Sequence, residues 1–362
     1  MHPLSPSLSR RQWLGGAAAS SLAAPDLIRF DRKIRVGLIG LGGHVGEILR
    51  PLPQLPDVEV VAISDPNPEA MASLARNPRI KAAAQYADFR QMLERERLDI
   101  AGVCGPNGGR AEKIVACVER KLHVVAEKPL AIELDELQRI KRAMARYQVR
   151  LTMLLPMRFS PPYLAIKRAV EAGEIGEVAQ IGAQKSYQLG ERPDWYHRRA
   201  TYGGTIPWIG IHMVDLMRWS SGREFTEAVS FQTRIAFPEL GDMENVTASL
   251  FRLDNGGVAT LRMDYLRPAA APTHGDDRLR LAGTKGVVEY QAPAGVVLMT
   301  EKAKPHVIQD LPEGRSLFVD FLESVYRGKS PALSLADIYR VNEIVLVARQ
   351  AAERHQILAL PS

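Results

Sequence analysis

A short apolar run followed directly by a glycine-rich turn is the feature that most constrains the fold of this chain. Residues 33–39, Lys-Ile-Arg-Val-Gly-Leu-Ile, are typical of a buried parallel strand, and Gly-Leu-Gly-Gly-His-Val-Gly follows at 40–46. Gly40 permits a tight turn, Gly42 lets the backbone approach a pyrophosphate, and a helix from Val45 to about residue 50 points its N-terminal amides at that phosphate. Because Val45 stands where the fingerprint has its third glycine, the turn needs support from its surroundings before it predicts a dinucleotide site.

The next apolar segment provides that support. A predicted strand over 58–64 ends at Asp65, about 20 residues beyond Gly42, which is the offset of the acid that binds the ribose hydroxyls of a dinucleotide. A carboxylate there repels the 2′-phosphate of NADP, so Asp65 favours NAD. The alternative interpretation is that Asp65 is a turn residue before Pro66.

Strands and helices continue to alternate after this point. We expect a helix over 88–97, a strand over 98–104, a turn at Gly105, Pro106 and Asn107, a helix over 110–120 and a strand over 122–126. This order predicts an α/β domain over 34–156, with a doubly wound parallel sheet that binds ligands at the carboxyl ends of its strands.

Two further motifs suggest a family. Glu127-Lys128-Pro129 follows the last predicted strand, and a Gly-Gly-x-x-x-x-x-Gly-x-His segment covers 203–212. With these motifs the chain resembles the Gfo/Idh/MocA family, which includes glucose-fructose oxidoreductase and inositol dehydrogenase, over about residues 34–360. The resemblance implies a Rossmann domain paired with an α+β domain over 157–362, whose open, mostly antiparallel sheet often forms an oligomer interface.

The resemblance also implies catalytic roles. Lys128 would touch the substrate hydroxyl beside the nicotinamide, through a Lys-Pro peptide that is commonly cis, and His212 would accompany it. Independently of the family, an ammonium beside a cationic nicotinamide in a partly dry pocket has a lowered pKa, which makes it a usable acid or base near neutrality. The alternative interpretation of Lys128 is a solvated lysine after a buried strand.

The cofactor site is predicted from the turns and the motifs together. The residues expected there are Gly40, Gly42, Gly43, His44, Val45, Asp65, Gly105, Pro106, Asn107, Glu127, Lys128 and Arg158. Arg158 lies in a Met-Arg-Phe-Ser-Pro segment similar to the element that opens the family's second domain.

The chain departs from the family pattern on the substrate side. Trp208 stands where relatives carry an aspartate that contacts the substrate and the histidine, and Arg110 stands where they often have histidine. A tryptophan accepts no proton, but it can stack on a sugar ring and donate one hydrogen bond. A polar, aromatic loop over 191–199 is expected to overhang the pocket, as a source of acid or base groups or as a lid without chemistry. The expected substrate residues are Trp208, Trp195, Tyr196 and His197, with Asp194 as a further acid.

The first 33 residues are predicted to be an export signal and linker. Arg10 and Arg11 precede a weakly apolar stretch over 13–24, a layout that resembles the twin-arginine signal of bacteria. This predicts a periplasmic protein, and the alternative is a basic tail on a cytoplasmic one.

Charge and cysteine content exclude several other classes. The net charge of +6 is spread without a basic run longer than two, which disfavours nucleic-acid binding and suits an anionic small ligand. Cys104 and Cys117 are too few for a metal cluster, and no segment has the length of a membrane span.

The favoured hypothesis is an NAD-dependent oxidoreductase that acts on a secondary alcohol of a sugar, polyol or glycoside. Lys128 and His212 would relay the hydroxyl proton, NAD would be tightly bound, and the open sheet would form a homo-oligomer. Two alternatives remain: a redox-neutral NAD-dependent glycosidase, and a non-catalytic NAD-binding sensor that has lost its chemistry with the aspartate at position 208.

Overall fold

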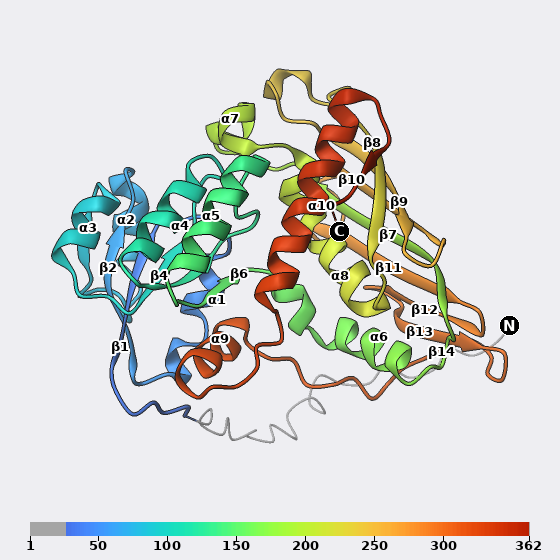
Figure 1. Cartoon of the computed structure of the whole chain (residues 1–362), viewed down its shortest axis with the longest axis horizontal. Helices are drawn as coiled ribbons and strands as arrows, with labels where there is room; N and C mark the ends of the chain where they lie inside the picture. Colours follow the sequence, from blue (N-terminus) through green and yellow to red (C-terminus); the bar gives the residue numbers. More distant parts are fainter. Residues whose placement is uncertain (1–26, 362) are drawn as a thin grey trace, which may run out of the picture.

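The computed structural model describes residues 27–361, which form two sheets side by side (Figure 1). The predicted export signal, with Arg10 and Arg11, lies outside the described residues. Among those described, no helix combines the length and apolarity needed to cross a bilayer.

The first sheet has six parallel strands in the order β3-β2-β1-β4-β5-β6, which confirms the predicted doubly wound fold. The strands are β1 (Ile34–Ile39), β2 (Val58–Ser64), β3 (Ala84–Tyr86), β4 (Ile100–Val103), β5 (His123–Ala126) and β6 (Leu151–Met153). The helices are α1 (Gly46–Leu49), α2 (Pro68–Leu74), α3 (Phe89–Arg95), α4 (Arg110–Glu119) and α5 (Leu134–Arg146). The order of the strands reverses between β1 and β4, so their carboxyl ends open a crevice where dinucleotides bind in such sheets.

The second sheet has nine strands in the order β14-β13-β12-β11-β7-β10-β9-β8-β15. These are β7 (Val178–Gln188), β8 (Phe225–Thr233), β9 (Val246–Leu253), β10 (Val258–Arg267), β11 (Gly275–Gly283), β12 (Gly286–Gln291), β13 (Gly295–Thr300), β14 (His306–Val307) and β15 (Leu358–Ala359). All neighbours are antiparallel except β7 and β10. The sheet is therefore open and mostly antiparallel, as predicted, and β9 and β10 form a hairpin in it.

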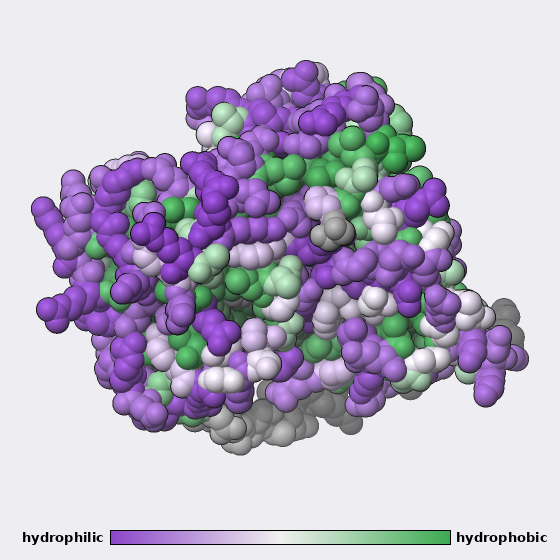
Figure 2. Space-filling view, in the orientation of Figure 1, coloured by the Kyte–Doolittle hydropathy of each residue, from purple (hydrophilic) through white to green (hydrophobic). Residues whose placement is uncertain are grey.

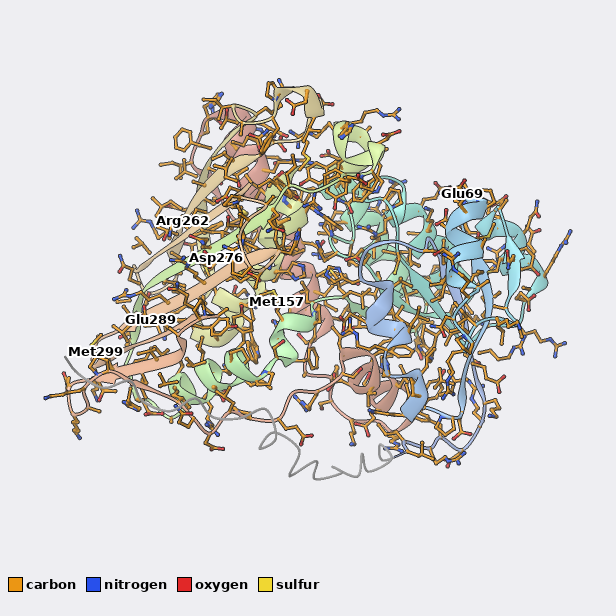
Figure 3. All side chains as sticks on the ribbon, turned by 180° about the vertical axis from the view of Figure 1, so that it is seen from behind. Glu69, Met157, Arg262, Asp276, Glu289 and Met299 are labelled. Carbon is orange, nitrogen blue, oxygen red and sulfur yellow. The ribbon has the colours of Figure 1, made fainter. Side chains whose placement is uncertain are left out.

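Among residues 27–361, helices cover one face of this sheet. They are α6 (Pro161–Glu171), α8 (Ile211–Ser221) and α10 (Leu335–Arg354). Along β10 the side chains alternate between buried and exposed, so one row packs under the helices and the other faces outward. Figure 3 shows Arg262, Glu289 and Met299 on the sheet, and all three are exposed.

The C-terminal part of the chain holds the two domains together. Helix α9 (Leu317–Tyr326) contacts α1 of the first domain, and on α10 the Asn342 Oδ1 accepts a hydrogen bond from the backbone N–H of Leu130 (2.8 Å). The face of the molecule in Figure 2 is mostly hydrophilic, with apolar side chains gathered where β8 and α10 meet. These contacts between the domains keep the ends of β4 and β5 opposite the helix-covered face of the second sheet.

Candidate active site

The glycine turn after β1 is packed too tightly for any other residue at its first position. Gly40 has a φ of +75°, and a Cβ there would lie 2.4 Å from the carbonyl oxygen of Cys104, at the end of β4. The 3-10 helix η1 (Gly43–Val45) then leads into α1. The two loops that should line a dinucleotide are thus in contact, as the sequence predicts.

Glu127 lies directly beneath this turn. Its carboxylate accepts a hydrogen bond from the backbone N–H of His44 and contacts the His44 Nδ1 at 2.9 Å, and a Cβ on Gly43 would lie 2.2 Å from its Oε2. Burial by itself would raise the pKa of Glu127, but His44, Lys128 and Arg110 lower it to about 2. A buried negative charge therefore lies at the expected cofactor edge.

Asp65 follows β2 at the same edge. Its Oδ2 accepts a hydrogen bond from the backbone N–H of Leu41 (3.0 Å), and its Oδ1 accepts one from that of Asn67 (2.9 Å). The carboxylate thus stabilises the glycine turn, at the end of the strand where the sequence predicts the ribose-binding acid.

Arg110, noted in the sequence only as a departure, connects two loops of the site. Its buried guanidinium donates hydrogen bonds to the carbonyl oxygens of Gly105 and Pro129 and to the Asn107 Oδ1. The Asn107 Nδ2 donates to the carbonyl oxygen of Tyr202 (2.7 Å) in the second domain. Burial lowers the pKa of Arg110 to about 10, so it stays charged at neutral pH.

Lys128 is buried at the junction of the domains. The Lys128–Pro129 peptide is cis, as the family resemblance implies, and the Nζ donates a hydrogen bond to the carbonyl oxygen of Trp208 (2.7 Å). The same Nζ lies 3.2 Å from the centroid of the Trp208 ring. Burial holds the pKa of Lys128 well below its usual value, against the opposing effect of Glu127. The structure therefore holds this amine in a fixed position, and burial favours its neutral form more than in a solvated lysine.

His212 is the second buried nitrogen base of the site. It lies at the start of α8, its ring meets that of His44 edge-on with centroids 5.4 Å apart, and its Nδ1 has no hydrogen-bond partner among the described residues. Burial lowers the pKa of His212 well below 6.5, and the charge of Lys128 adds to this effect. His212 is therefore neutral at physiological pH.

Trp208 belongs to an aromatic cluster. It lies in a π-helical turn, η5 (Ile206–Gly210), a distortion often found at functional sites. Its ring meets Trp195 and Tyr196 edge-on at 5.5 and 5.9 Å, and Tyr196 stacks on Tyr202 at 4.9 Å. Because Lys128 covers one face of the Trp208 ring, the structure gives this ring a role in holding the lysine.

The loop over 191–199 is divided between two environments. Trp195 and Tyr196, in the 3-10 helix η4 (Asp194–His197), pack into the aromatic cluster, whereas Asp194 is exposed. The backbone of His197 packs against the turn at Gly241, away from the cluster. The Nε2 of its ring has no hydrogen-bond partner among residues 27–361. Burial raises the pKa of Tyr196 to about 12, so its hydroxyl stays protonated at neutral pH.

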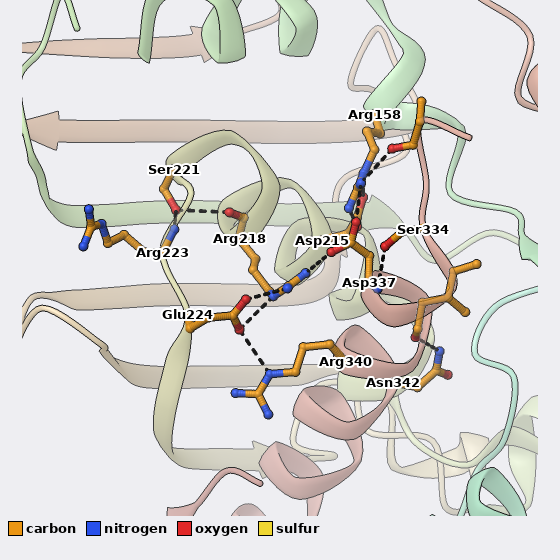
Figure 4. A network of polar contacts seen from close by, with 12 residues as sticks. Arg158, Asp215, Arg218, Ser221, Arg223, Glu224, Ser334, Asp337, Arg340 and Asn342 are labelled. Atoms are coloured by element: carbon orange, nitrogen blue, oxygen red, sulfur yellow. Dashed lines mark hydrogen bonds and ion pairs between the residues drawn. The ribbon is translucent and has the colours of Figure 1, made fainter. Parts of the chain in front are cut away.

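Arg158, which we expected at the cofactor, instead forms ion pairs with two aspartates of the second domain. Its Nε donates to the Asp215 Oδ2 and its Nη1 to the Asp337 Oδ2, both at 3.1 Å, and these pairs continue through Arg218 to Glu224 (Figure 4). The network anchors α8 and α10 behind the site. The structure therefore gives Arg158 a structural role, because both of its carboxylate partners come from the second domain.

Sequence analysis did not identify Lys185. This buried lysine on β7 donates to the Asp277 Oδ2 (2.8 Å) and contacts the Met157 Sδ (3.3 Å). Its charge contributes to the lowered pKa values of Lys128 and His212. No pattern in the sequence indicates it, because strand alternation does not reveal which face of β7 meets the catalytic residues.

The residues at the sheet edge fit NAD. The turn is open at Gly42, where a Cβ would meet only the Cα of Gly105, at 4.0 Å, and Asp65 follows β2 at the same edge. Residues 27–361 contain no group of three or more histidine, cysteine or acidic side chains suited to a metal ion, and both cysteines are buried.

Comparisons with known proteins agree with this geometry. A model described as an oxidoreductase family with an NAD-binding Rossmann fold matches residues 34–155, and one described as the GFO/IDH/MocA C-terminal domain matches 163–289. The chain is 30% identical to an uncharacterised oxidoreductase, YrbE, of Bacillus subtilis (76% of this chain, 80% of that one) and 26% identical to myo-inositol 2-dehydrogenase of Thermotoga maritima (84% and 92%). The solved structure of an oxidoreductase from Thermotoga maritima is 32% identical over 90% of this chain and all of that one, with a TM-score of 0.85. The chain therefore belongs to the GFO/IDH/MocA family of oxidoreductases, with NAD as its cofactor.

Proposed function

We propose that this protein is a dehydrogenase that transfers hydride from a secondary alcohol of a sugar, polyol or glycoside to NAD. The observation that carries the proposal is the pair of buried nitrogen bases, Lys128 and His212, whose pKa values burial lowers where the second domain meets the cofactor edge. The similarity to a myo-inositol dehydrogenase supports a polyhydroxylated substrate.

Lys128 and His212 have different roles toward the hydroxyl groups of the substrate. NAD, when bound, accepts the hydride from the carbinol carbon. Lys128 donates one N–H to the carbonyl oxygen of Trp208, which orients the amine so that its lone pair can take the proton of the substrate hydroxyl. The His212 Nδ1, which has no partner among the described residues, can accept a hydrogen bond from a second substrate hydroxyl. The negative charge of Glu127 would stabilise the cationic nicotinamide of bound NAD.

The test is to incubate the purified protein with NAD and a panel of cyclic polyols, sugars and glycosides, and to follow NADH absorbance. Reduction of NAD by at least one of them is expected. Release of free sugar from a glycoside without accumulation of NADH would instead support the redox-neutral glycosidase. Retention of NAD with neither reaction would support the sensor.

We also propose export by the N-terminal segment and tight retention of NAD. An enzyme folded before export carries its cofactor with it, so NAD should copurify with the protein from the periplasm. Replacing Arg10 and Arg11 by lysine should leave the protein in the cytoplasm, and an unchanged location would contradict the export signal.

The open face of the second sheet supports a homo-oligomer. Phe231 and Leu250 are 66% and 44% exposed on it, beside a hollow of about 650 Å³. We propose that a second copy covers this face. Sedimentation of the wild type as a dimer or larger, and of Phe231→Glu as a monomer, would support the interface, whereas a monomeric wild type would exclude it.

A further inference from the structure

Trp208 contacts the amine of Lys128 in two ways. Its carbonyl oxygen accepts the hydrogen bond from the Lys128 Nζ (2.7 Å), and the centroid of its ring lies 3.2 Å from the same atom. The exposed fractions are 2% for Lys128 and 7% for Trp208, so little water competes for these contacts. One residue therefore contributes both to the position of this amine and to its electrostatic surroundings.

The surrounding structure fixes the Trp208 ring. The π-helical turn η5 packs against β10 so closely that a Cβ on Gly210 would lie 2.6 Å from the Met263 Sδ. Trp195 and Tyr196 meet the ring edge-on, at 5.5 and 5.9 Å. Because the backbone and two aromatic neighbours hold the ring, it cannot turn away from the amine without moving them.

The Trp208 ring favours the charged form of Lys128. The face of an indole ring carries partial negative charge, and it attracts an ammonium group most strongly where water is excluded. Burial has the opposite effect, because it disfavours the charged form and lowers the pKa of Lys128. The ring therefore offsets part of the cost of a charged lysine without adding a full negative charge to the site.

Charged groups from several other elements also face Lys128. Glu127, directly after β5, attracts the ammonium form. The groups that repel a charged Lys128 are Lys185 on β7, Arg110 on α4, Arg192 in the loop before η4 and, when protonated, His212 on α8. Because the repelling groups outnumber this carboxylate, loss of the Trp208 ring should leave the ammonium form with little compensation.

We propose that Trp208 is a positioning residue for the reaction: its carbonyl oxygen and ring hold Lys128 in place, and the π electrons of the ring set the pH above which Lys128 acts as a base. The inference rests on the proposed dehydrogenase function, in which Lys128 takes the hydroxyl proton. It predicts that an aromatic ring at position 208 keeps the lysine protonated to a higher pH than an aliphatic side chain would.

The experiment follows the protonation of Lys128 directly. The protein is labelled with carbon-13 at the ε carbon of lysine, the Lys128 signal is identified by its loss in Lys128→Met, and its titration midpoint is measured by NMR. Trp208→Phe, with a less electron-rich ring, should lower the midpoint by about half a pH unit, and Trp208→Leu by about one. Trp219→Phe is the matched control, because that ring faces Arg158 and Lys167 and its loss should leave the midpoint unchanged. An unchanged or raised midpoint in both Trp208 variants would overturn the proposal.

A fluorinated ring separates the electronic effect from a structural one. Tryptophan fluorinated on its six-membered ring has a weaker π face and nearly the same shape, so its incorporation should lower the Lys128 midpoint in the wild type but not in Trp208→Phe. A shift of equal size in Trp208→Phe would come from another tryptophan and contradict the proposal.

The rate of NAD reduction distinguishes this inference from the proposed function. The acid limb of log kcat/KM against pH should follow the NMR midpoint and move to lower pH in Trp208→Phe. A shifted midpoint without oxidation of any sugar would contradict the proposed function but keep the effect of Trp208 on the lysine. Oxidation of a sugar with an acid limb that does not move would do the reverse.

Discussion

The cofactor edge and the substrate side of this site are built in different ways. The cofactor edge consists of backbone groups and glycines in turns that directly follow β1 and β4, with Asp65 after β2. On the substrate side, Lys128 meets Trp208, 80 residues later, and Lys185 meets Asp277, 92 residues later. The first region therefore depends on local backbone geometry, and the second on how two domains are packed.

The largest expected effect separates chemistry from cofactor binding. Lys128→Met should lower kcat by about 10² or more, the worth of a positioned acid or base, while the Kd for NAD stays within a few-fold. Steady-state kinetics and NAD titration measure the two effects, and Lys81→Met, at an exposed lysine, is the control. An unchanged kcat would remove the proposed mechanism and favour the sensor.

The second prediction concerns a variant that should weaken cofactor binding, Gly43→Ala at the cofactor edge. Gly43→Ala should weaken NAD binding by about tenfold or more, because its Cβ would displace the Glu127 carboxylate. Gly173→Ala has the same left-handed strain, with a φ of +72°, but no atom within 4 Å of its Cβ, and it should lower only stability, by about 1 kcal/mol. Equal NAD affinities of the two variants would mean that contact with Glu127 is unimportant.

Asp65 tests whether the cofactor edge discriminates between the two dinucleotides. Asp65→Ala should shift the ratio of NADP to NAD affinity toward NADP by about tenfold, because the repulsion of the 2′-phosphate is lost. Loss of the hydrogen bond to Leu41 should weaken the binding of both dinucleotides, so the ratio of their affinities isolates the effect of the 2′-phosphate. Tighter binding of NADP than NAD by the wild type would contradict the prediction.

The smallest expected effect concerns His212 and pH. Its folded pKa lies well below 6.5, so the unfolded chain binds more protons as the pH falls through 6.5, and the free energy of unfolding decreases. His212→Asn should reduce this loss between pH 7 and pH 5, by at most about 1.4 kcal/mol per pH unit. Urea unfolding at several pH values provides the measurement, and identical slopes would show that burial of His212 carries no such cost.

Regular elements with a full pattern were predictable. The strand, turn and helix at residues 34–49 and the strand β2 agree with the sequence prediction, and α4 begins at Arg110 as expected. Strands β3 and β6 were not predicted, because three residues are too few to show an alternation.

The sequence by itself determined the cofactor half of this protein, because a glycine turn and an acid after the next strand depend on backbone geometry that a local pattern specifies. Tertiary structure alone decided that Trp208 holds Lys128, that Arg158 anchors α8, and that Lys185 pairs with Asp277. Those roles depend on the low dielectric and close packing between two domains, and burial by distant segments leaves no local signal in a sequence.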